Sequence, residues 1–145
     1  MRTVVISGAS SNVGKTTLAR KIASILPGAV FIKIGHGTEK NGVDNVYYHI
    51  GISFERIRRE NRNASFLVIE SNTILKEMTP DCVIYLPGEN PKPSAAAARE
   101  SADIIRGEKV DFETARRLKK DLAVSETVLI DIIKASEALF CERDD

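Results

Sequence analysis

Residues 3–18, TVVISGASSNVGKTTL, decide the fold of this chain. A short apolar run at positions 4–6 is followed by a loop of small residues, and the segment after Gly14 has apolar residues at helical spacing. This order predicts a strand, a close loop and a helix. Small residues let the backbone wrap around a ligand, so that the N–H groups of the loop and of the helix N-terminus converge on one point. The stretch is therefore typical of a phosphate-binding loop.

The spacing of the two glycines is a variant of the P-loop motif. The usual G-x4-G-K-[ST] pattern would place its first glycine at position 9, but Ala9 is there and Gly8 precedes it, so the loop is G-x5-G-K-T. A glycine-rich turn that only starts a helix would explain the glycines but not the Lys-Thr-Thr that follows. Lys15 is expected to contact the β- and γ-phosphates of a nucleotide, and the Thr16 hydroxyl to coordinate Mg²⁺. The residues expected to bind the nucleotide are Gly8, Ser10, Ser11, Asn12, Val13, Gly14, Lys15, Thr16 and Thr17.

Length and composition are those of an ordinary globular protein. The chain has 145 residues, of which 43% are hydrophobic and 28% charged, and this size suits one domain. We expect a single nucleotide-binding domain with an α/β core at 1–107 and C-terminal helices at 108–145. No segment reaches the length of a membrane span, and the N-terminal apolar run is too short for a signal peptide. A cytoplasmic protein that does not bind membranes is therefore expected.

Charge and cysteine content argue against two further classes of protein: those that bind nucleic acid, and those held together by disulfides or a C-x2-C metal site. The net charge is +1, so no global field attracts nucleic acid, and basic clusters at 56–62 and 116–120 are typical of solvated helix faces. Nucleic-acid binding is therefore not expected. Cys82 and Cys141 are isolated and form neither a disulfide framework nor a C-x2-C metal site. Both are expected to act as small apolar residues.

The rest of the chain alternates expected strands and helices. Strands are expected at 29–34, 65–69 and 81–86, with a short extended piece or turn at 45–51, and the segment 35–45 is expected to be a loop. Helices are expected from the Ser53 cap to about 61, from the Ser94 cap to 106 with Gly107 as the stop, at 112–122, and at 126–140 with Ser125 as the cap. A frayed tail would follow. The chain thus predicts a three-layer α/β P-loop NTPase fold, with a mainly parallel sheet of about four to five strands and a helical C-terminal part.

Two carboxylates could complete the site. Glu70 ends a buried strand expected to lie beside the first one, where an acidic residue can ligate Mg²⁺ or hold a metal-bound water. With Lys15 it is an expected catalytic residue, although strand ends also carry solvated glutamates. Asp44 is a further expected Mg²⁺ ligand, with ordinary turn chemistry as the alternative.

Other polar residues are candidates for contacts with a second substrate or a base. Lys33 interrupts an apolar strand and could contact a phosphate or a substrate carboxylate, or could extend to water. His36 could act in acid–base chemistry or be an ordinary loop residue. Asn90 and Lys92 follow the fourth expected strand, where GTPase-like proteins carry N-K-x-D, but this chain lacks the Asp. A rigid proline turn is the alternative there.

The loop G-A-S-S-N-V-G-K-T resembles that of dethiobiotin synthetases and of cobyrinic or cobyric acid synthases, which belong to the SIMIBI class of P-loop proteins. The sequence I-K-I-G-H-G at 32–37, the glycine-rich loop after it and L-V-I-E at 67–70 resemble the molybdopterin-guanine dinucleotide biosynthesis protein B (MobB) family. The resemblance covers about residues 1–90. It implies that Glu70 belongs to the Mg²⁺ site and that Lys33 and His36 line the second-substrate side.

The resemblance and the motif together predict Mg²⁺-dependent binding and slow hydrolysis of a nucleoside triphosphate, GTP or ATP, in support of cofactor biosynthesis. A partner enzyme of that pathway is expected, and proteins of this class often pair as homodimers across the nucleotide face. One alternative is an ATP-dependent small-molecule ligase or kinase resembling dethiobiotin synthetase. Another is a non-catalytic nucleotide-binding module that contacts a partner through its C-terminal helices.

Overall fold

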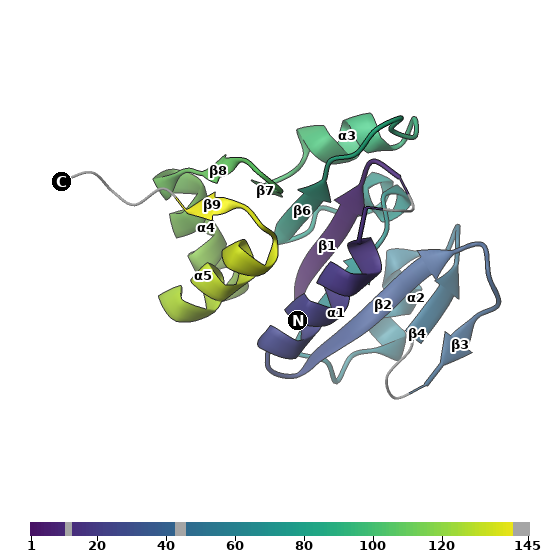
Figure 1. Ribbon diagram of the computed structural model, residues 1–145. Coiled ribbons are helices and arrows are strands. Elements are labelled where there is room, and N and C mark those ends of the chain that lie inside the picture. Colours follow the sequence, from purple (N-terminus) through teal and green to yellow (C-terminus); the bar gives the residue numbers. More distant parts are fainter. Residues whose placement is uncertain (11–12, 43–45, 141–145) are drawn as a thin grey trace.

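The computed structural model describes residues 1–10, 13–42 and 46–140 (Figure 1). Ser11, Asn12, Asp44 and the expected tail with Cys141 lie outside the described residues. Seven strands form the main sheet in the order β3-β4-β2-β5-β1-β6-β7, and all neighbours are parallel except β3 and β4. The strands are β1 (Arg2–Gly8), β2 (Ala29–Gly35), β3 (Lys40–Asn41), β4 (Val46–His49), β5 (Phe66–Glu70), β6 (Cys82–Leu86) and β7 (Ile104–Ile105). The expected mainly parallel α/β sheet is confirmed.

β1 is the central strand that carries the glycine-rich loop. It pairs with β5 on one side and β6 on the other, and Val4, Val5 and Ile6 are all fully buried. A strand covered on both faces needs a continuous apolar run rather than an alternating one, which explains the sequence here. Val4 and Ile6 face one core cluster, whereas Val5 faces the other. The loop therefore starts from a buried strand at the centre of the sheet.

Helices cover both faces of the sheet. On one face, α1 (Lys15–Ile25), α4 (Phe112–Leu122) and α5 (Glu126–Ala135) share the core cluster that contains Val4 and Ile6. On the other, α2 (Phe54–Glu60) and the 3-10 turn η1 (Thr73–Lys76) pack on the cluster around Val5, and α3 (Ala95–Glu100) packs on Tyr85. Figure 1 shows α1 in front of the sheet and α2 behind it. The fold thus has three layers.

Several helix boundaries are confirmed as predicted. α4 has the predicted bounds, and α2 begins after Ser53, whose hydroxyl accepts a hydrogen bond from the N–H of Arg56. The hydroxyl of Ser125 likewise accepts from the N–H of Val128 at the start of α5. Each cap supplies an acceptor to an N–H that has no partner inside its helix.

The predicted helix at 94–106 is wrong beyond Glu100. α3 has only six residues, and the chain then forms β7, whose Ile104 is fully buried and pairs with Ile84 of β6. The Asp103 carboxylate accepts the N–H of Val83 and fixes this turn. Burial of Ile104 against the sheet thus overrides the helical preference of the alanine-rich segment. Gly107 is not a helix stop; it has φ 83° in the turn between β7 and β8.

Three further predictions need correction. The helix predicted at 126–140 ends at Ala135, and β9 (Leu139–Phe140) then pairs with β8 (Lys109–Val110) in a separate two-stranded sheet. The segment predicted as a loop at 35–45 contains β3, which pairs with β4. Within the described residues, the main sheet consequently has seven strands instead of four to five. The extra strands β3 and β7 have two residues each, too short for a periodic pattern to reveal them.

Cys82 lies in β6 with no exposed surface, as expected for a cysteine that acts as a small apolar residue. Burial raises the pKa of its thiol well above the ordinary value. Among the helices that the structure describes, none combines the length and apolar character needed to span a membrane.

Candidate functional site

Polar side chains from three elements meet at the carboxyl ends of the central strands. Glu70 is the last residue of β5, and in the sheet it is paired with Ile6 of β1 on one side and with Lys33 of β2 on the other. β1 ends at Gly8, two residues beyond Ile6, and after the loop α1 starts at Lys15. The carboxyl edge of a parallel sheet is where ligands of α/β proteins bind. The parallel register therefore brings residues 6, 33 and 70 to the start of α1.

The centre of this cluster is the contact between Thr16 and Glu70. The Thr16 hydroxyl lies 2.9 and 2.8 Å from the two carboxylate oxygens of Glu70. Lys33 Nζ donates to the Thr16 hydroxyl oxygen at 3.2 Å and lies 3.8 Å from Glu70 Oε2. The Glu70 side chain is only 7% exposed, whereas that of Lys33 is 43% exposed. A buried carboxylate thus faces a hydroxyl, and a cation beside them remains accessible to solvent.

Lys15 lies across the first glycine of the loop. A Cβ at Gly8 would come within 3.1 Å of the Lys15 side chain and within 2.7 Å of Val13 Cγ2, so only glycine lets these side chains close over the end of β1. Partial burial lowers the pKa of Lys15; Glu70 opposes this effect, while Lys92 and Lys33 add to it. Three lysines consequently concentrate positive charge at this edge of the sheet.

Asn72 is a structural residue of the site that the sequence analysis did not single out. Its Oδ1 accepts the N–H of Gly8 at 3.0 Å, and its Nδ2 donates to the carbonyl of Gly8 at 2.9 Å. The N–H of Ser71 donates to the carbonyl of Ile6, so the Asn72 amide extends the pairing of β5 with β1 from Ile6 to Gly8. Nδ2 also lies 3.3 Å from Ser94 Oγ. Ser94, expected to cap α3, makes no side-chain hydrogen bond to that helix. In the sequence, the polar run directly after Glu70 is the one feature that could have marked Asn72 as a residue of the site.

The segment after β6 forms one wall of the loop. The N–H of Lys92 donates to the carbonyl of Ala9 at 2.8 Å, and a Cβ at Gly88 would come within 2.6 Å of Val13 Cγ1. Lys92 is therefore attached to the loop by its backbone, and its charge acts on Lys15. Asn90 is exposed at φ 52°, a conformation that asparagine tolerates in turns. The structure thus brings Lys92 to the site and places Asn90 in the turn before it.

His36 lies beyond the end of β2 with its ring against that of His49. The ring centroids are 6.3 Å apart in an edge-to-face arrangement. His49 Nδ1 lies 2.9 Å from the Ile50 carbonyl oxygen, and both histidines are exposed. Among the described residues, no hydrogen bond joins His36 to Thr16, Lys33 or Glu70. The two histidines form a pair of their own beside the cluster.

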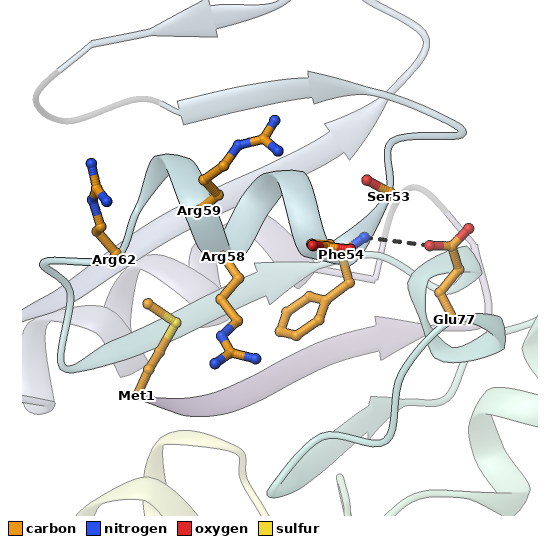
Figure 2. Close-up of a pocket in the computed structure, with 8 residues that line it drawn as sticks. Met1, Ser53, Phe54, Arg58, Arg59, Arg62 and Glu77 are labelled. Carbon is orange, nitrogen blue, oxygen red and sulfur yellow. Dashed lines mark hydrogen bonds between the residues drawn. The ribbon is translucent and has the colours of Figure 1, made fainter.

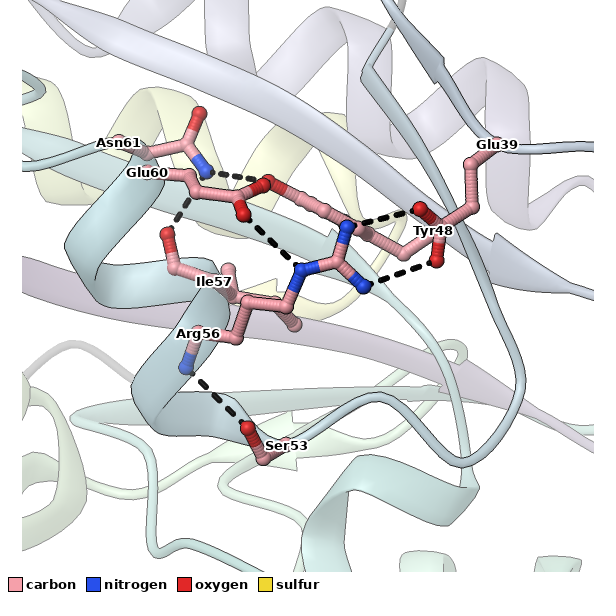
Figure 3. Close-up of polar contacts among 7 residues, drawn as sticks. All are labelled: Glu39, Tyr48, Ser53, Arg56, Ile57, Glu60 and Asn61. Atoms are coloured by element: carbon pink, nitrogen blue, oxygen red, sulfur yellow. Dashed lines mark hydrogen bonds and ion pairs between the residues drawn. The ribbon is translucent and has the colours of Figure 1, made fainter.

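The loop that follows His36 is held by charged side chains from α2 (Figure 3). Arg56 donates to both carboxylate oxygens of Glu39, at 3.2 and 2.8 Å, and its Nε donates to Glu60 at 2.9 Å. Glu60 also accepts the Tyr48 hydroxyl, which in turn accepts from the Asn61 amide. This network fastens the outer side of the carboxyl edge to the layer that contains α2.

Oxygen ligands at the cluster suit Mg²⁺, although they are few. The Thr16 hydroxyl and the Glu70 carboxylate are the donor types that Mg²⁺ prefers, and this ion usually keeps several waters and phosphate oxygens as its other ligands. No group of three His, Cys, Asp or Glu side chains that could hold a metal ion occurs in the part of the chain that the structure describes. The Thr16 and Glu70 oxygens thus fit an Mg²⁺ ion whose other ligands are waters and phosphate oxygens.

A surface depression lies away from this cluster, beside α2 (Figure 2). It has a volume of about 850 Å³, and its lining includes Met1, Arg58, Arg59 and Arg62. Arg58 extends between Met1 and Phe54, whereas Arg59 and Arg62 extend in the opposite direction. Because their guanidinium groups do not converge, the depression has no evident ligand chemistry. Size alone does not identify the functional site here.

Comparison of the chain with profiles of known protein families, with curated proteins and with solved structures gave no match. The chemical interpretation of the site therefore rests on its own residues.

Proposed function

We propose that this protein binds a nucleoside triphosphate together with Mg²⁺ at the loop from Gly8 to Thr17, and that it hydrolyses the nucleotide slowly. The observation that carries the proposal is the contact of the Thr16 hydroxyl with both carboxylate oxygens of Glu70, at the start of α1. A helix N-terminus after a glycine-rich loop favours phosphate, and the Thr16–Glu70 pair supplies oxygen ligands for the accompanying ion.

The charges around the loop support a polyphosphate as the ligand. Lys15, Lys33 and Lys92 lie close enough together for the last two to lower the pKa of the first. A bound polyanion would relieve their mutual repulsion. Lys15 would hold the β- and γ-phosphates, and Lys33 would contribute a second positive charge beside Glu70. Mg²⁺ would supply neutralisation of the negative charge that develops on the phosphate oxygens.

Slow hydrolysis is proposed because the described residues offer few groups for activating water. His36, the candidate for acid–base chemistry, contacts His49 rather than the Thr16–Glu70 cluster. Positioning and electrostatic stabilisation by Lys15 and Mg²⁺ would then provide most of the catalysis, with water as the nucleophile.

Calorimetric titration with ATP and with GTP, each with and without Mg²⁺, tests this proposal. We expect Mg²⁺-dependent binding that Lys15→Ala abolishes. Lys21→Ala is the matched control, since Lys21 lies in the same helix with an exposed side chain. Failure of both nucleotides to bind the wild-type protein would refute the proposal. Turnover is measured in the same samples as phosphate release.

A small-molecule ligase or kinase is the second candidate, and the exposed ammonium of Lys33 favours it. With its side chain 43% exposed beside Glu70, Lys33 could hold the carboxylate of a second substrate as well as a phosphate. This candidate predicts that phosphate release stays low until a small carboxylic acid is added. A screen of such acids that never stimulates release would argue against it. Binding without turnover under every condition would instead favour a non-catalytic nucleotide-binding module.

The cellular role that we propose is support of cofactor biosynthesis, as in the MobB family that residues 1–90 resemble. It rests on that resemblance, and it calls for a partner enzyme of the same pathway and allows a homodimer. Size-exclusion chromatography with light scattering, with and without nucleotide, tests for the dimer.

A further inference from the structure

Arg106, from the C-terminal part of the chain, reaches the glycine-rich loop. It follows β7, and its Nη1 donates to the carbonyl of Val13 at 2.9 Å. Its Nη2 lies 3.7 Å from the place that a Cβ of Gly14 would occupy. The guanidinium thus lies against the residues just before Lys15. In sequence, 93 positions separate Arg106 from Val13.

This contact fixes the orientation of one peptide unit. In a planar trans peptide, the carbonyl and the following N–H point in opposite directions. Because Arg106 holds the carbonyl of Val13, the N–H of Gly14 must point away from Arg106. Gly14 adopts φ 92° at this point, and a single residue in the left-handed conformation between neighbours is the geometry that turns successive N–H groups toward an anion. Arg106 therefore favours the orientation in which the Gly14 N–H can meet a phosphate.

Arg106 is held in turn by Glu137, in the turn that follows α5. Its Nε is buried and lies 3.1 Å from Glu137 Oε2, which balances the charge although the two groups are not aligned for a hydrogen bond. The N–H of Gly107 donates to the carbonyl of Glu137 at 2.9 Å. Glu137 has φ 57° and precedes β9. Glu137 therefore contacts Arg106 through its side chain and Gly107 through its backbone carbonyl.

We propose that Arg106 is a positioning residue of the anion-binding loop, and that through it the C-terminal segment with α4, α5 and β9 controls how tightly the loop holds a polyphosphate. The proposal rests on the proposed function for its ligand. Its structural core, the orientation of the Val13–Gly14 peptide, can be tested without any ligand.

The ligand-free test uses the amide signal of Gly14 in a two-dimensional ¹⁵N–¹H NMR spectrum. In Arg106→Ala we expect this signal to shift and its exchange with solvent to accelerate, because the Val13 carbonyl loses its donor. Arg106→Lys should restore part of the wild-type behaviour. Arg99→Ala is the matched control: Arg99 forms an ion pair with Glu108 in the same region, and its guanidinium lies over the ring of Tyr85.

The ligand test measures affinity for MgATP by calorimetry. Loss of one hydrogen bond to a charged donor should weaken binding about tenfold in Arg106→Ala, with partial recovery in Arg106→Lys and no change in Arg99→Ala. Glu137→Gln should weaken binding in the same direction but less, because the Glu137 side chain is 70% exposed.

The outcomes separate the two proposals. If the wild-type protein binds no MgATP, the proposed function fails, and the Gly14 signal alone decides whether Arg106 orients the loop. If MgATP binds and Arg106→Ala changes neither its affinity nor the Gly14 signal, the positioning role is refuted. If Arg106→Ala does not fold, the same comparison is made with Arg106→Lys and Glu137→Gln, and wild-type behaviour in both overturns the proposal.

Discussion

At the sheet edge formed by the carboxyl ends of the strands, the loop over β1 and β5 and the loop over β2 and β4 are held in place by different kinds of contact. Over β1 and β5, Asn72 bonds both backbone groups of Gly8, and Glu70 faces Thr16 with its side chain 7% exposed. Over β2 and β4, the loop with Glu39 is held by Arg56, and both of these side chains are more than one-third exposed. One side uses shielded hydrogen bonds and the other uses ion pairs in contact with water.

This difference predicts different responses to conditions. Exposed ion pairs contribute little and are screened by salt, whereas a buried backbone group that loses its partner carries the full cost of desolvation. The side with the glycine-rich loop should therefore keep its geometry over a wide range of salt. The side with His36 and Glu39 should open more readily, which would suit the entry of a second substrate.

The largest expected effect is that of Asn72→Ala on stability. The substitution leaves the N–H and carbonyl of Gly8 without their partners, and Gly8 is buried. We expect the free energy of unfolding to fall by about 3 kcal/mol, measured by urea denaturation. Asn63→Ala, at an exposed position before β5, is the control. A loss in Asn72→Ala no greater than in this control would remove the distinction between the two sides.

Nucleotide affinity should depend on pH through Lys15. Binding of an anion favours the charged ammonium, so affinity is greatest below the pKa of Lys15 in the ligand-free protein. Because this pKa is lowered from its ordinary value of 10.5, chiefly by burial, the affinity should fall already at a pH below 10.5, by up to about tenfold per unit. Calorimetry with MgATP across alkaline pH measures this. Lys15→Arg should flatten the profile because a guanidinium stays charged; an equally steep profile in that variant would assign the effect to another group.

Tyr48→Phe tests the hydrogen bonds of the outer side. The Tyr48 hydroxyl donates to Glu60 and accepts from Asn61. Asn61 keeps its bond to the Ile57 carbonyl, and Glu60 keeps Arg56. Because both partners remain satisfied, we expect a loss of only about 1 kcal/mol in the free energy of unfolding. A loss as large as that of Asn72→Ala would mean that this side is as firmly built as the other.

Arg56→Ala should change global stability least. Its ion pairs are exposed, so we expect an unfolding midpoint close to that of the wild type, together with faster hydrogen exchange at residues 36–42, which lose their anchor at Glu39. High salt should reproduce the faster exchange in the wild-type protein. Arg58→Ala on the same helix is the control. Unchanged exchange at 36–42 in Arg56→Ala would show that the loop is held by other contacts.

The sequence predicted what periodicity and local chemistry determine. The apolar run at 4–6 marks β1, the caps Ser53 and Ser125 mark α2 and α5, and Glu70 ends β5. The parallel arrangement of the strands was also predictable, because strands and helices alternate along the sequence. Placing Glu70 at the strand end made its approach to Thr16 foreseeable, since both lie at one edge of the sheet.

The contacts that depend on tertiary pairing could not be predicted. The alanine-rich segment after Ser94 has helical composition throughout, and only burial of Ile104 against β6 turns its second half into a strand. The helix predicted at 94–106 includes Arg106, and no local pattern indicates its hydrogen bond to the carbonyl of Val13. The sequence predicts an irregular loop at 35–45 because the pairing of β3 with β4 involves only two residues of each strand.

The hydroxyl of Tyr47 imposes a coupled choice of residues at three positions. It accepts the N–H of Gly37 at 2.7 Å, and a Cβ at Gly37 would come within 3.0 Å of the hydroxyl oxygen, with the Cβ of a residue at Gly35 closer still. A side chain at either glycine therefore requires a smaller residue at 47. In evolution, positions 35, 37 and 47 should vary together, and a designed library of this loop should randomise them jointly.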